Sequence, residues 1–273
     1  MRDLDWNKTK TIFIVVFSIL NVFLYSLYLN RHTEAQNIQV IGTTSIEDSL
    51  KMDDITFDSL PIYKKDSSHI SAKTAEFTNE QVRKLENQTV GIINSTQIQS
   101  KLQTPVSIQN AKGDFTFTEF LSKYVLKGEE YGLWKVDKEE REATFFQKVN
   151  DGPIYFSPNA MLTVHFDEDG KATSYEQTMF DDFVSFNRKK DLLSPIEAIG
   201  SLYSRGYLKT GSTVKDVTFG YSILAQMPEI QLFAPTWHVR VELKNGKIED
   251  YFIHAVEGKI IEFQAEPVDD DHE

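Results

Sequence analysis

The sequence contains no cysteine, which excludes a disulfide scaffold and any cysteine-ligated metal site. It is also short of basic residues, because 29 Lys and Arg face 41 Asp and Glu and leave a formal net charge of -12. This deficit excludes a basic nucleic-acid binder, so we expect no nucleic-acid partner. With 273 residues, 40% of them hydrophobic, the chain can still bury the core of one large or two small globular domains.

Motifs of the common enzyme classes are missing as well. No HExxH, GxSxG, SxxK, P-loop or dinucleotide fingerprint occurs. The acidic pairs Asp181-Asp182 and Glu139-Glu140 are adjacent in sequence, so their side chains diverge and a solvated face is the better interpretation. We therefore predict a protein that is not an enzyme, with no catalytic residue and no cofactor.

Histidines are few and scattered, which argues against a metal site. His165 and Asp167 would share one side of a strand, but Thr163 stands where a third ligand would be needed. His238 and His254 could be neighbours across a predicted hairpin, yet two ligands alone do not make a zinc site. The sequence thus predicts no bound metal.

Charge is missing altogether from residues 11–29, which read TIFIVVFSILNVFLYSLYL. A helix of this length at about 1.5 Å per residue spans roughly 28 Å, close to the hydrocarbon core of a bilayer. The run is longer than the apolar region of a signal peptide, and no A-x-A-like cleavage site follows it. It predicts an uncleaved single-pass transmembrane helix, with a buried core helix as the less favoured alternative.

The charges beside this run predict its orientation. Arg2, Lys8 and Lys10 precede it, whereas only Arg31 follows closely. Basic residues favour the cytoplasmic side of a membrane. We therefore expect residues 1–10 in the cytoplasm and the chain beyond about residue 30 outside the cell, attached to the cell membrane.

Polar side chains within the run form one stripe. Ser18, Asn21, Tyr25 and Tyr28 are separated by 3, 4 and 3 positions, so a helix places them on one face. An amide facing lipid near the bilayer centre is costly, which makes this stripe a candidate contact with partner helices. The alternative interpretation is that a strongly hydrophobic span tolerates one Asn without a dedicated partner.

Capping signals predict two helices beyond residue 113, and each is followed by strand-like runs. The capping boxes are Thr116 with Glu119 and Ser194 with Glu197; the helices are expected to stop at Gly128 and Gly206. Strands are predicted at 143–149, 160–166, 173–180, 213–224, 236–243, 248–256 and 259–263.

Landmarks recur at a nearly constant offset. Thr116 to Ser194 is 78 positions, Gly170 to Gly246 is 76, and Tyr175 to Tyr251 is 76. The sequence therefore predicts an α+β fold with two duplicated units of a helix and an antiparallel sheet.

The predicted organisation is a cytoplasmic N-terminus 1–10, a transmembrane helix 11–29, a stalk 30–60 with one short helix, a region of uncertain strands and helix 61–112, a first repeat 113–190, a second repeat 191–267 and an acidic tail 268–273.

Two family resemblances follow from these residues. Residues 5–14, DWNKTKTIFI, run directly into a span that contains LNVFL at 20–24, and this start is similar to that of the YycI (WalI) family. The later Tyr155-Phe156, the Asp-Gly-Lys at 169–171 and the final GKIIEF at 258–263 also resemble that family. The course from Trp237 to Lys259 looks like a PepSY-type extracytoplasmic module, and the repeats are expected to be PepSY-like or YycH-like.

The resemblance to YycI implies a function. Members are accessory membrane proteins of the WalK (YycG) sensor kinase and the WalR (YycF) regulator, which control cell-wall metabolism. It implies a non-enzymatic regulator that contacts the kinase and a companion protein, YycH, through its transmembrane helix and outer domain. The PepSY-like course favours an alternative, a binding or inhibitor module for a wall ligand or a secreted protease.

Overall fold

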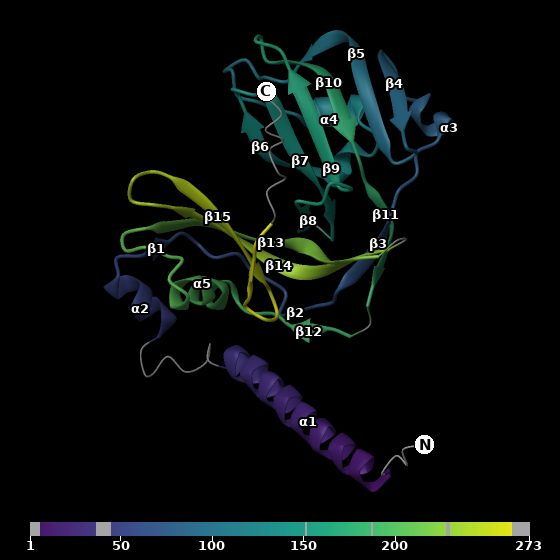
Figure 1. Ribbon diagram of the computed structural model, residues 1–273. Coiled ribbons are helices and arrows are strands. Elements are labelled where there is room, and N and C mark those ends of the chain that lie inside the picture. Colours follow the sequence, from purple (N-terminus) through teal and green to yellow (C-terminus); the bar gives the residue numbers. More distant parts are fainter. Residues whose placement is uncertain (1–5, 37–44, 151, 187, 228–229, 264–273) are drawn as a thin grey trace, which may run out of the picture.

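The computed structural model describes the backbone of residues 6–36, 45–150, 152–186, 188–227 and 230–263. One N-terminal helix is followed by two sheet-rich lobes, which together form a mixed α+β fold dominated by strands (Figure 1). We define the first lobe as residues 75–179 and the second lobe as residues 45–74 together with 180–263. The first lobe is thus an insertion within the second.

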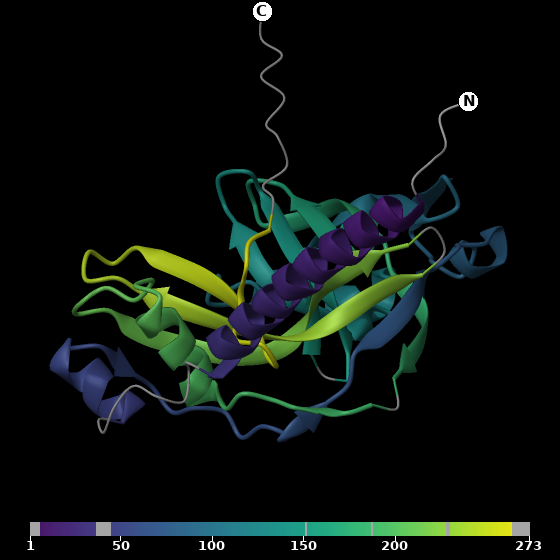
Figure 2. The ribbon, with the colours of Figure 1, turned by 60° about the horizontal axis from the view of Figure 1, so that its bottom comes forward.

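Helix α1, Trp6–Gln36, is drawn apart from both lobes in Figure 1 and crosses in front of them in Figure 2. Its described side chains are those of residues 10, 11 and 13–27, and the large apolar ones from Phe13 to Leu27 are 46% to 74% exposed. Among all described side chains, no helix is both long and apolar enough to cross a membrane. A transmembrane helix at residues 11–29 therefore stays a prediction.

The first lobe is a six-stranded antiparallel sheet with a helix on one face. Its strand order is β6-β7-β9-β10-β5-β4. Buried Phe117 and Phe120, at the start of α4, pack edge-on against Phe145 and Tyr175 of the sheet. The elements are α3 Asn79–Val82, β4 Gln88–Ile93, β5 Gln97–Ser107, α4 Thr118–Tyr124, η1 Gly128–Glu130, β6 Tyr131–Asp137, β7 Glu142–Val149, β9 Met161–Phe166 and β10 Lys171–Gln177.

The second lobe is built around two long strands. β14 pairs with β13 along one edge and with β3 and then β15 along the other. Helix α5 packs its buried Ile199 and Leu202 in one core with Trp237 of β14, and Trp237 Nε1 donates to the Leu193 carbonyl at 2.9 Å. The elements are α2 Ile46–Met52, β1 Thr56–Phe57, α5 Pro195–Ser204, β13 Thr213–Gln226, β14 Gln231–Glu242, β15 Ile248–His254 and β16 Ile260–Ile261.

Paired segments carry the chain into and out of the first lobe. The entering strands β2, Asp66–Ser67, and β3, Ile70–Thr74, pair with the departing strands β12, Lys190–Asp191, and β11, Phe180–Ser185. The Ala75 amide donates to the Met179 carbonyl at 2.9 Å and closes the base of the lobe. Strand β8, Gly152–Tyr155, pairs with both β7 and β13, so it ties the two lobes together.

The predicted order of a helix followed by antiparallel strands is present in both lobes. It runs α4, β7, β9, β10 in the first lobe, where β6 precedes β7, and α5, β13, β14, β15 in the second. The Ser194–Glu197 capping box is confirmed, with Pro195 at the start of α5 and Gly206 just beyond its end at φ +76°.

The other capping box was predicted wrongly. α4 begins after Phe117, which makes no side-chain capping bond, and it ends at Tyr124 instead of running to Gly128. The Thr116 amide donates to the Ile108 carbonyl at 2.8 Å. This backbone contact holds Thr116 against the preceding segment, and its side chain does not cap α4. Gly128 instead serves a close approach, because a Cβ there would lie 2.0 Å from the Leu121 carbonyl oxygen.

Parts of the predicted stalk and of the predicted region 61–112 belong to the two lobes. Of the predicted stalk 30–60, residues 46–57 pack on the second lobe, where Leu50 is fully buried and β1 pairs with β13. Of the predicted region 61–112, β2 and β3 join the second lobe while β4 and β5 extend the sheet of the first. These partners lie far away in sequence, so local patterns cannot reveal them.

Candidate functional site

The predicted partner-contact residues lie along α1. Ser18, Asn21 and Tyr25 are exposed, while Tyr28 belongs to the helix but its side chain lies outside the described residues. Asn21 Nδ2 donates to the Phe17 carbonyl at 2.9 Å, so one donor of the amide is satisfied within the helix itself. The stripe is therefore present on one helix, and its contact with a partner stays a prediction.

An aromatic cluster, the interlobe cluster, joins the two lobes. Trp134 and Phe146 come from the first lobe, and His238 and Phe252 from the second. The ring centroids of Trp134 and His238 are 5.0 Å apart, and Tyr155 of the connecting strand β8 lies 4.9 Å from Phe252. Sequence reasoning missed this cluster, although the adjacent aromatic pairs Phe145-Phe146 in β7 and Tyr251-Phe252 in β15 were a visible signal.

The Asp250 carboxylate contacts His238 and Arg240 at the edge of the interlobe cluster. His238 Nε2 lies 2.6 Å from Asp250 Oδ1, and the two side chains are 3% and 28% exposed. Arg240 Nε donates to the same oxygen at 2.8 Å while its guanidinium lies 5.1 Å from the Trp134 ring centroid. Burial would raise the pKa of Asp250, but the hydrogen bonds from His238 and Arg240 outweigh it and hold that pKa below its ordinary value.

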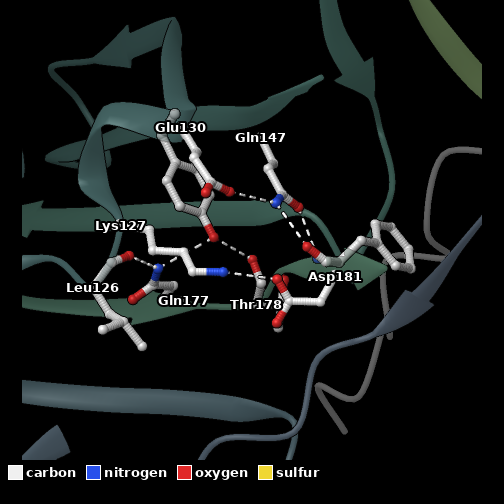
Figure 3. Close-up of polar contacts among 9 residues, drawn as sticks. Leu126, Lys127, Glu130, Gln147, Gln177, Thr178 and Asp181 are labelled. Atoms are coloured by element: carbon white, nitrogen blue, oxygen red, sulfur yellow. Dashed lines mark hydrogen bonds and ion pairs between the residues drawn. The ribbon is translucent and has the colours of Figure 1, made fainter. Parts of the chain in front are cut away.

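Buried amides fix the strand that leaves the first lobe (Figure 3). Gln147 of β7 is fully buried; its Nε2 donates to the Phe180 carbonyl at 2.9 Å and its Oε1 accepts from the Phe180 amide at 2.7 Å. The same Nε2 donates to Glu130 Oε2 at 3.1 Å. One side chain therefore meets both backbone groups at the start of β11.

A second amide holds the neighbouring turn in Figure 3. Gln177 Nε2 donates to the Leu126 carbonyl at 2.6 Å and lies 3.3 Å from the Tyr131 hydroxyl. That hydroxyl donates to the Thr178 carbonyl at 2.6 Å. Burial raises the pKa of Tyr131 well above its ordinary value, so the phenol stays protonated and keeps this donor.

One ion pair covers this network on the solvent side. Lys127 Nζ lies 2.8 Å from Asp181 Oδ1, with side chains 41% and 45% exposed. The hydrogen bond to Asp181 raises the pKa of Lys127. The network of Figure 3 thus consists of amides, a phenol and carbonyls in mutual contact, which suits it to positioning β11 against the first lobe.

Within the described residues, the histidines considered as metal ligands do not gather into one site, and His254 instead lies near His69, at 6.1 Å between ring centroids. His165 Nδ1 lies 3.1 Å from Glu142 Oε1, while the Asp167 carboxylate accepts from the amides of Asp169 and Lys171 in its own turn. His238 and His254 lie on the paired strands β14 and β15 but not directly opposite each other, because the register pairs His238 with Phe252 and His254 with Thr236. Within the described residues, no group of three or more potential ligands could hold a metal ion.

Comparisons with known proteins give one family match. The model of the family described as "YycI protein" matches residues 33–256. No curated protein matches the chain. Among solved structures, an uncharacterized protein from Eubacterium rectale ATCC 33656 is 12% identical, with 87% of this chain and 99% of that chain covered and a TM-score of 0.47. The Bacillus megaterium YpeB C-terminal domain is 14% identical, with 70% and 100% covered and a TM-score of 0.35.

Proposed function

The chain belongs to the YycI family, and on this premise we propose that it is a membrane-anchored, non-enzymatic regulator of a sensor histidine kinase that controls cell-wall metabolism. The kinase is of the WalK type, and a YycH-type protein is the companion. The observation that carries this proposal is the family match, which covers residues 33–256 and so includes the whole first lobe and all of the second lobe except residues 257–263.

The anchor is proposed from the sequence at residues 11–29. These residues are uncharged and are flanked by more basic residues before than after. The exposed apolar side chains from Phe13 to Leu27 support the proposal, because a surface of this kind is unfavourable in water and suits a lipid environment. In this arrangement the lobes lie outside the cytoplasmic membrane. Protease added to spheroplasts should digest the chain beyond residue 35, and full protection would contradict this orientation.

The contact with the kinase is proposed along the stripe of Ser18, Asn21, Tyr25 and Tyr28. A single helix in lipid can pass information only by changing how it packs, and that packing relies on small and polar residues. The lobes supply a second contact, so that two modest interfaces on one tether act together.

Site-specific photo-crosslinking in intact cells tests this proposal. A photoreactive residue at position 21 should capture the kinase, whereas one at Phe23, on the opposite face of α1, should capture little. Equal capture from both faces would contradict a contact along the stripe. Capture of unrelated membrane proteins alone would contradict the proposed function.

A further inference from the structure

The outer edge of β13 is left open between two short partners. β14 covers one edge of β13 along its whole length. On the other edge, β1 pairs in parallel at Thr213 and Val214, and β8 pairs in parallel at Tyr221 and Ser222. Among the described residues, no strand pairs with this edge from Lys215 to Phe219. These five residues leave room for about 16 Å of added strand at roughly 3.3 Å per residue.

A groove of about 650 Å³ lies against this open edge. Val217, Phe219 and Trp237 line it from the sheet, and Tyr63 comes from the segment that links β1 to β2. Tyr63 packs edge-on against Trp237 at 5.8 Å between ring centroids, so this wall is held in place. Such a volume lies within the range of protein ligand sites, about 300 to 1,000 Å³.

The rim of the groove is basic although the whole chain is acidic. Its charged lining consists of Lys64, Lys189 and one acidic residue, Asp66, from the segments 61–68 and 188–192. These two segments carry five basic and two acidic residues, in a protein with a net charge of -12. Among the described residues Lys64 makes no ion pair. Lys189 contacts Asp66 at 3.2 Å, with side chains 67% and 45% exposed, and an exposed pair of this kind is weak and easily exchanged.

We propose that this groove binds an extended acidic peptide, which adds as a strand to β13 between β1 and β8. The open backbone groups of β13 supply main-chain hydrogen bonds, as in other cases of strand addition. Alternate side chains of the peptide face the aromatic floor, and its carboxylates lie near Lys64 and Lys189. The occupant is a segment of another protein, and this inference does not depend on the proposed control of a kinase.

Fluorescence anisotropy with the full chain in detergent tests the charge component. The probe is a labelled heptapeptide of alternating valine and aspartate, and its counterpart carries lysine in place of aspartate. The acidic peptide should bind and the basic one should not. Lys64→Glu with Lys189→Glu should weaken binding by about tenfold or more, because two attractive charges become repulsive. The matched double variant Lys84→Glu with Lys101→Glu makes the same change in net charge at two exposed positions of the first lobe. It should leave the affinity for the acidic peptide within about twofold of the wild type.

Backbone methylation of the peptide tests strand addition without altering the protein. In a strand at a sheet edge, only alternate amides face the sheet. Methylation of all valine amides or of all aspartate amides should therefore abolish binding in one series and preserve it in the other. Equal binding of both methylated peptide series would overturn the proposal. Equal affinity of the two lysine double variants for the acidic peptide would also overturn it. Binding that emerges only after removal of residues 264–273 would show that the groove takes the chain's own acidic tail, and would overturn assignment to a partner.

Discussion

The side-chain amide of Gln147 acts as a strand partner for Phe180. It donates to the Phe180 carbonyl at 2.9 Å and accepts from the Phe180 amide at 2.7 Å, and both residues are fully buried. β11 begins at this point and carries the chain from the first lobe to the second. A single side chain thereby fixes where one lobe ends and the connection to the other begins.

Replacement of Gln147 by Leu should destabilise the protein by roughly 2 to 5 kcal/mol, because it leaves two buried backbone groups of Phe180 without partners. Chemical denaturation of the full chain in detergent measures this change. The exposed Gln103 offers the matched control, and Gln103→Leu should change the free energy of unfolding by less than about 0.5 kcal/mol. Similar effects of the two substitutions would contradict the role assigned to Gln147.

The two predicted capping boxes give a paired test. Ser194→Ala should cost about 1 kcal/mol, because the Ser194 hydroxyl accepts from the Glu197 amide at 3.4 Å at the start of α5. Thr116→Ala should cost less than about 0.5 kcal/mol, since the structure gives this side chain no capping role. Denaturation midpoints of both variants against the wild type provide the measurement, and equal losses would show that Thr116 does cap α4.

These two boxes also show how far the sequence could predict the fold. The Ser194 box follows from local spacing and is correct, because the Ser194 amide donates to the Glu197 carboxylate and the Glu197 amide donates to the Ser194 hydroxyl. The Thr116 box has equivalent spacing, but the hydrogen bond from the Thr116 amide to the Ile108 carbonyl holds this residue in a position where it does not cap α4. Helix α5 and the strands β7, β9, β10, β13, β14 and β15 were likewise predictable from local patterns, whereas β6 and β8 were not among the predicted strands.

Contacts that are distant in sequence were not predictable. Gln147 and Phe180 are 33 positions apart, and neither residue type indicates an amide in place of a strand partner. The same holds for β1 and the open edge of β13, which depend on pairing between segments more than 150 positions apart. The stripe on α1 was accessible from the sequence because a single helix fixes its spacing.

The free energy of unfolding at low pH should depend on Asp250. Its pKa is held below the ordinary value of 3.8, so its charged form favours the folded state. The stabilisation is fully present above about pH 5 and is lost as the pH falls through the lowered pKa. Asp250→Asn should therefore cost about 1 to 2 kcal/mol at pH 7, and the difference from wild type should narrow below about pH 4.

Unfolding curves between pH 3 and pH 7 measure this dependence. Asp58→Asn, at an exposed position, is the control and should follow the wild type at every pH. A loss for Asp250→Asn that stays constant down to pH 3 would mean that the carboxylate charge is not what stabilises the contact with His238.

Asn21→Leu tests the stripe on α1. The change raises hydrophobicity, so membrane insertion should persist, while a partner contact should weaken by about 1 kcal/mol or roughly fivefold. The bond from Asn21 to the Phe17 carbonyl uses only one of the two amide donors, which leaves the other available to a partner. Quantitative co-purification with the kinase measures the effect. Phe23→Leu on the opposite face should leave recovery unchanged, and equal recovery for both variants would remove Asn21 from the contact.

Exchange of the whole span tests most directly the central claim, that α1 regulates the kinase through contact with its membrane helices. Residues 11–29 are replaced by an unrelated apolar helix of the same length, with the flanking charges and both lobes unchanged. Association with the kinase and expression of the genes it controls are then measured together in cells. The proposed mechanism predicts that both are lost although the protein remains in the membrane. Full preservation of both would contradict it, because the helix would then be only an anchor and the lobes would carry the signal.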